Sequence, residues 1–112
     1  MLRHSYTAIV ERAQPLRGEF STEPYEAGWA SEALIFIKVR EAMGSGQTLE
    51  AWVQISPDGI DWVDEGTQFP AIGAKGLYCV KLKHFGNWLR VAGRVGGSDN
   101  PVKATVYVAL KE

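Results

Sequence analysis

Catalysis requires a nucleophile, an acid–base pair or a bound metal, and few residues of this chain qualify. The histidines His4 and His84 are 80 positions apart, a spacing that suggests no shared metal ligation, and both are interpreted as solvated residues near strand ends. Cys79, the single cysteine, excludes an internal disulfide and has no neighbouring base that would generate a thiolate. The sequence therefore predicts neither an enzyme nor a cofactor.

Four acidic residues, Asp58, Asp61, Asp64 and Glu65, surround one turn. Carboxylates and backbone carbonyls are the ligands that Ca²⁺ prefers, so a calcium site is one interpretation. The other interpretation is that these acids form the turn and face the solvent. Asp58 fits this interpretation, because it belongs to the turn itself. We favour the second interpretation and predict no metal.

The remaining polar chemistry lies on faces opposite to aliphatic rows. These outward positions combine large aromatic side chains with basic and amide groups: Phe36, Lys38, Arg40, Trp52, Gln54, Lys81, Lys83, Trp88, Arg90, Arg94 and Tyr107. Trp, Tyr and Arg are enriched in protein interfaces, and aromatic rings also stack on sugars or on single-stranded nucleic acid. The five residues expected to form an interface or a ligand platform are Phe36, Trp52, Trp88, Arg90 and Tyr107. A purely structural role, covering the edges of the core, is the alternative.

Period-2 alternation of apolar residues indicates the strands that position these side chains. Five segments alternate clearly: residues 33–40, 49–55, 78–83, 88–95 and 102–111. Residues 5–12 and 19–21 are weaker candidates. The alternation predicts an inner row formed by Ile35, Ile37, Val53, Ile55, Val80, Leu82, Leu89, Val91, Val106 and Val108. Residues 23–32 could hold one helical turn, although Pro24 and Gly28 limit it.

Glycine-rich and proline-rich turns separate these segments at intervals of about 10–17 residues, a rhythm typical of antiparallel sandwiches. One apolar face per strand requires two sheets packed face to face. The 112 residues suffice for one domain, spanning residues 1–112. We predict an all-β protein, a single antiparallel sandwich of about seven or eight strands.

The motif Gln-x-Ser-x-Asp-Gly-x-x-Trp marks the best-defined turn, and it comprises Ser56, Asp58, Gly59 and Trp62 after Gln54. It resembles a turn of small β-sandwich modules, including discoidin-like and jelly-roll carbohydrate-binding domains and small phage virion proteins. Residues 76–82 and 85–91 resemble paired late strands of such sandwiches. The resemblance implies a jelly-roll-like fold.

The charge is distributed unevenly although the net charge is −1. Residues 1–66 hold five Lys/Arg and eleven Asp/Glu, whereas residues 67–112 hold seven and two. Folding either interleaves these halves or gives opposite faces opposite signs, which would favour head-to-tail contacts between copies.

The low net charge argues against a nucleic-acid partner, and no apolar run is long enough to span a membrane. No signal peptide is visible, so we expect a virion or cytoplasmic location. Together these features predict a non-catalytic structural subunit of a larger assembly, such as a phage virion, decoration or shell protein, working as a homo-oligomer. The alternative is a carbohydrate-binding module that uses exposed Trp or Tyr.

Overall fold

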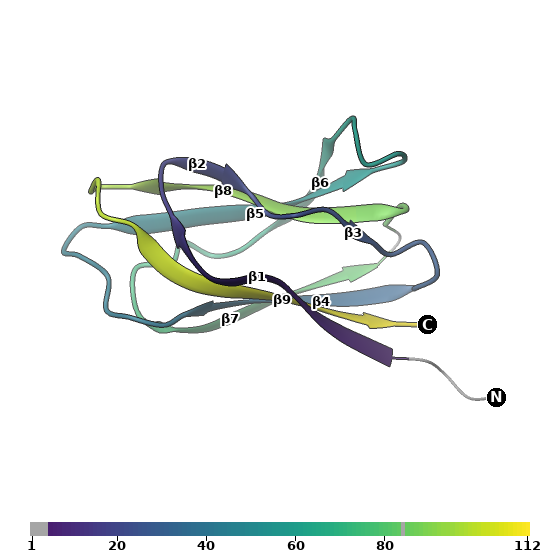
Figure 1. Ribbon diagram of the computed structural model, residues 1–112, viewed down its shortest axis with the longest axis horizontal. Coiled ribbons are helices and arrows are strands. Elements are labelled where there is room, and N and C mark those ends of the chain that lie inside the picture. Colours follow the sequence, from purple (N-terminus) through teal and green to yellow (C-terminus); the bar gives the residue numbers. More distant parts are fainter. Residues whose placement is uncertain (1–4, 84) are drawn as a thin grey trace.

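Two antiparallel sheets pack face to face in the computed structural model, which describes residues 5–83 and 85–112 (Figure 1). For residues 5, 6 and 8–14 it describes the backbone only. The strands are β1 (Ser5–Leu16), β2 (Glu19–Ser21), β3 (Tyr25–Glu26), β4 (Glu32–Val39), β5 (Thr48–Ser56), β6 (Val63–Gln68), β7 (Gly76–Lys83), β8 (Trp88–Gly96) and β9 (Val102–Lys111). The all-β prediction is confirmed.

The strand order is that of a jelly roll. Sheet A has the order β1-β9-β4-β7, and sheet B has the order β2-β8-β5-β6 with β3 also paired to β8. Because β2 and β3 pair with different parts of β8, they are two pieces of one edge strand. Counted in this way, the described residues form four strands in each sheet, and the chain crosses between sheets at every connection except β5–β6.

The predicted inner row is confirmed as the core. Eight of the ten predicted residues are buried between the sheets, and Ile55 and Val80 are partly buried against them. Each strand contributes alternate residues because successive side chains point to opposite faces of a pleated sheet. Ile35, Val53 and Leu89 have no exposed surface at all.

Two further core residues come from a connection without a periodic pattern. Phe69 and Ile72 follow β6 and are buried. Their backbones pair with β5: Phe69 N–H donates to Ala51 O at 2.9 Å, and Ile72 exchanges hydrogen bonds with Leu49 at 2.8 and 3.0 Å. This pairing holds both side chains in the core.

One expectation needs correction. Residues 23–32 form no helical turn, because Tyr25 and Glu26 pair with Leu89 and Trp88 as β3. The short edge segment expected at residues 19–21 is confirmed as β2, and the structure adds a strand that was not expected, β6, which shows no apolar alternation. Most of β6 is exposed at the edge of sheet B, where a strand needs no buried row.

Candidate interaction surfaces

The outer surface of sheet A, here called face A, has an aromatic centre bordered by lysines. Phe36 on β4 and Tyr107 on β9 are cross-strand neighbours and both are half-buried. Phe36 is also paired with the exposed Cys79 on β7. The described outward lysines of this sheet are Lys38, Lys81, Lys83, Lys103 and Lys111. Cross-strand aromatic neighbours stabilise the sheet and also offer a flat apolar surface to a partner.

The outer surface of sheet B, here called face B, is organised by two arginines on β8. The Arg90 guanidinium lies 4.3 Å from the centroid of the Trp62 ring, a cation–π contact. Its Nε donates to Gln54 Oε1 at 2.7 Å, and Gln54 Nε2 donates in turn to Asp64 Oδ1 at 3.0 Å. Partial burial lowers the pKa of Arg90 from its ordinary value. The network holds the guanidinium in one orientation and joins β8, β5 and β6.

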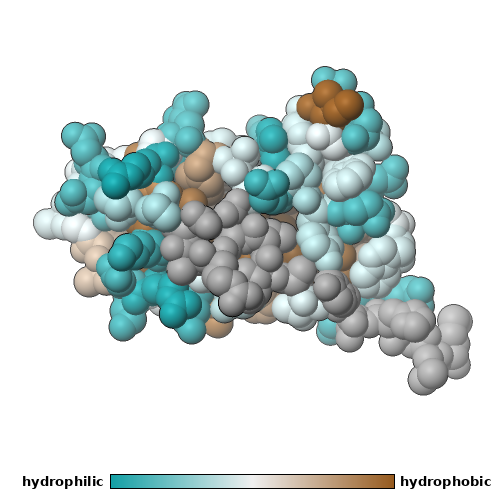
Figure 2. All heavy atoms as spheres, viewed as in Figure 1, coloured by the Kyte–Doolittle hydropathy of each residue, from teal (hydrophilic) through white to brown (hydrophobic). Residues whose placement is uncertain are grey.

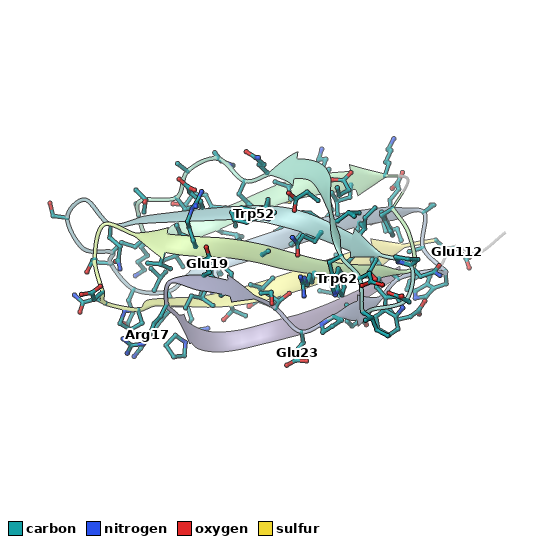
Figure 3. All side chains as sticks on the ribbon, turned by 90° about the horizontal axis from the view of Figure 1, so that it is seen from above. Arg17, Glu19, Glu23, Trp52, Trp62 and Glu112 are labelled. Carbon is teal, nitrogen blue, oxygen red and sulfur yellow. The ribbon has the colours of Figure 1, made fainter. Side chains whose placement is uncertain are left out.

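The second arginine borders a hollow beside Trp52. Arg94 Nε donates to Glu50 Oε2 at 2.9 Å, and the Arg94 guanidinium lies 6.0 Å from the Trp52 ring centroid. Between the two arginines the short side chain of Ala92 forms the floor of a hollow of about 550 Å³. Figure 3, which looks onto face B, shows Trp52 on the central strand β5, with Trp62 toward its end. An indole, two guanidiniums and an amide thus surround one depression.

The predicted turn motif forms a closed hydrogen-bond network. Ser56 Oγ accepts from the backbone N–H of Gly59 at 2.8 Å and of Asp58 at 3.2 Å, and it donates to Asp58 Oδ1 at 2.9 Å. Asp58 Oδ1 also accepts from the backbone N–H of Asp61 at 3.0 Å and of Ile60 at 2.8 Å. The Asp61 and Ile60 amides and the Ser56 hydroxyl lower the pKa of Asp58, because they stabilise the carboxylate. The turn is therefore rigid.

Gly59 adopts φ +79°, the left-handed conformation that the glycine of a Pro-Asp-Gly turn favours. A Cβ built there would lie 3.4 Å from the Trp88 indole. The Trp88 ring therefore packs beneath the turn, so this predicted interface residue supports the β5–β6 connection as well. Trp62, at the end of the motif, covers Arg90, a role that the motif alone did not indicate.

The five predicted platform residues do not form one surface. Phe36 and Tyr107 lie on face A, whereas Trp52, Trp88 and Arg90 lie on face B. The hollow has no signal in the sequence, because Ala92 and Arg94 are brought beside Trp52 only by the pairing of β8 with β5.

The charge asymmetry of the sequence persists in space. The described outward charges of β4, β7 and β9 on face A are five lysines and one acid, Glu32. On face B the described outward strand charges are four acids, Glu19, Glu26, Glu50 and Asp64, and two arginines. Asp58 and Asp61 add to the acidic side at the turn. The fold therefore gives the two faces opposite signs of charge, which is the second of the two interpretations of the charge pattern.

His4 and His84 lie outside the described residues. The acids near the turn are occupied locally: Asp58 caps the turn, Asp64 accepts from Gln54, and Glu65 Oε1 accepts from the Thr67 N–H at 3.0 Å. Within residues 5–83 and 85–112, no group of three His, Cys, Asp or Glu side chains could hold a metal ion. No helix in that part of the chain could cross a membrane.

Solved structures with the same fold define the class of protein. The SPBc2 prophage-derived protein YomS superposes with a TM-score of 0.64 at 9% identity, covering 100% of this chain and 96% of that chain. The PBSX exported protein XepA gives a TM-score of 0.58 at 10% identity, covering 97% of this chain and 36% of that chain. The chain is a jelly-roll sandwich whose fold is shared with phage-derived proteins, as the turn motif predicted.

A subunit of Bacillus endospore appendages, a family of disulfide-linked pili, also shares the fold, with a TM-score of 0.54, 6% identity, and coverage of 98% of this chain and 85% of that chain. Residues 43–112 match the family described as Domain of unknown function (DUF6385), and the chain belongs to that family. The matched region begins just before β5 and includes the turn, face B's arginines and β9. None of the curated proteins matches the sequence.

Proposed function

We propose that this chain is a non-catalytic structural subunit of a larger assembly, of the phage virion, decoration or shell type, and that it acts through protein–protein contacts. In this proposal residues 1–112 work as one domain, the copies form a homo-oligomer, and the location is the virion or the cytoplasm. The observation that carries the proposal is the pair of outer faces with aromatic anchors and opposite charge.

Geometry supports this role. A sheet of four strands, each about eight residues long, covers an area of about 19 by 26 Å. A stable interface buries about 800 Å² of accessible surface on each partner, more than the plane of about 500 Å² of one sheet, so a contact would use a whole face together with the turns that border it. Phe36 and Tyr107 on face A and Trp52 on face B are anchors of the type that dominates interface energies.

The test is the mass of the purified protein in solution, measured by light scattering and native mass spectrometry, with electron microscopy of the same sample. We expect species larger than one chain, and we expect Phe36→Ala or Trp52→Ala to shift the distribution toward monomer without changing the far-UV spectrum. These residues are better probes than Trp88, whose indole also supports the turn at Gly59. A protein that remains monomeric at high concentration would contradict the proposal.

The hollow beside Trp52 favours a second candidate function, carbohydrate binding. A partly exposed indole provides a stacking surface for a sugar ring, and Gln54, Arg90 and Arg94 supply hydrogen-bond groups around it. Affinity electrophoresis in gels containing soluble polysaccharides tests this candidate. Retardation of a monomeric wild type, abolished by Trp52→Ala and unaffected by Phe36→Ala on the opposite face, would favour carbohydrate binding over assembly.

A further inference from the structure

The β5–β6 turn presents a large apolar side chain to solvent. Ile60 is 78% exposed, the largest exposure among the described large hydrophobic residues. Figure 1 shows this connection projecting from sheet B on the side away from sheet A, and Figure 2 shows a hydrophobic patch at its tip. Asp58 and Asp61 are exposed on either side of Ile60, and the network around Ser56 holds their backbone in place.

The opposite face of the molecule contains a groove with the complementary character. This groove of about 370 Å³ runs over β7, β4 and β9. Leu34 and Ala109 are cross-strand neighbours and form its apolar floor, because the short alanine side chain leaves a depression beside the leucine. The rim carries three lysines, Lys81, Lys83 and Lys111, and one acid, Glu32.

The two features match in polarity and in charge. The rim of the groove has a net charge of +2, and the two aspartates beside Ile60 contribute −2. Because the turn projects beyond sheet B and the groove lies outside sheet A, one molecule cannot bring its own turn into its own groove. A second copy of the chain provides the matching surface.

We propose that the β5–β6 turn of one copy inserts Ile60 into the face A groove of a second copy, with Asp58 and Asp61 pairing with the lysines of the rim. This inference rests on the proposed function as an assembly subunit and specifies its contact. The contact joins surfaces on opposite faces of the molecule, so two copies cannot form it reciprocally, and it propagates into a chain or a ring. The row next to the groove carries Phe36 and Tyr107, which extend the apolar surface offered to the partner.

The test separates the two halves of the contact. Ile60→Asp places a charge at the tip of the turn, and Ala109→Trp fills the groove from an outward position of β9. The matched controls are Ile60→Leu, which keeps the tip apolar, and Ala109→Ser, which keeps the groove open. Circular dichroism and thermal melts establish that each variant is folded, and if Ala109→Trp is not, Lys81→Glu with Lys83→Glu replaces it.

We expect the two disruptive variants to be monomeric at concentrations where the wild type and both controls assemble, with self-association at least about tenfold weaker because a buried isoleucine contributes that much or more. An equal mixture of the disruptive variants should form a one-to-one pair and nothing larger. The intact groove of Ile60→Asp can accept the intact turn of Ala109→Trp, and both remaining ends are blocked.

Assembly of either disruptive variant as in the wild type would overturn this inference and leave the proposed function standing. A mixture that remains monomeric would do the same. A wild type that is monomeric throughout would overturn both. Sodium chloride raised from 50 to 500 mM should weaken the wild-type assembly, since the ion pairs of the rim are accessible to solvent.

Discussion

Val53 on β5 offers the sharpest test of the alternation on which the fold rests. Its side chain has no exposed surface and lies on the inner face of sheet B, directly across from Val91 on β8. Val53→Ala removes two carbon atoms from this position. The matched control is Glu50→Ala on the same strand, whose side chain points outward and is 51% exposed.

The expected loss of stability has two contributions. Two buried carbons contribute about 1.6 kcal/mol at about 0.8 kcal/mol each. A residual cavity of at most about 50 Å³ adds up to about 1.2 kcal/mol. Val53→Ala should therefore lower the free energy of unfolding by about 2–3 kcal/mol. Glu50→Ala breaks an exposed ion pair with Arg94 and should lower it by about 0.5 kcal/mol or less.

Urea denaturation followed by tryptophan fluorescence measures both values, and a thermal melt provides a second reading. For a chain of this size, 2–3 kcal/mol corresponds to a decrease in Tm of about 10 °C. The slope of the urea transition should be unchanged, because the exposed area on unfolding hardly differs. Equal destabilisation by the two substitutions would refute the assignment of inward and outward faces on β5.

Two further predictions concern the turn. Gly59→Val should destabilise the protein by more than about 1 kcal/mol in urea denaturation, because a β-branched residue at φ +79° is strained and its Cβ lies against Trp88. Gly73→Val, at a glycine without positive φ, should have a smaller effect, and the reverse order would contradict the reasoning. Because the folded-state pKa of Asp58 is lowered, its stabilising contribution is present above the ordinary aspartate pKa of about 4 and decreases as the pH falls toward the folded value. Asp58→Asn should therefore make unfolding stability less dependent on pH between about 5 and 2, and an unchanged profile would show that the hydrogen bonds to this carboxylate do not matter.

The inner rows and the main turn could be predicted from the sequence because both depend on local physics. A pleated strand places alternate residues on opposite faces, so Ile35, Ile37 and Val53 identify the buried side wherever the strand pairs. In the same way, the order Ser56, Asp58, Gly59 encodes a turn because each side chain bonds its own neighbouring backbone. Neither inference needs knowledge of the partner strand.

Segments that lack apolar residues on one face could not be predicted from the sequence in this way. The edge strand β6 has no buried row to reveal it, and Phe69 and Ile72 are buried by backbone pairing with β5 rather than by any periodicity. The short strand β3 has two residues and is stabilised by β8, more than 60 positions later in the chain. Such pairings are decided by long-range contacts.

The surfaces depend on strand order in the same way. Aromatic and basic residues such as Trp52 and Arg90 could be assigned to outer faces from alternation, but not to one face or the other, because alternation says nothing about which strands become neighbours. Only the jelly-roll order places Leu34 beside Ala109 to form the groove, and directs the lysines to face A while four acids lie on face B. Local periodicity determined which side chains face outward, and the long-range pairing of strands decided which of them meet.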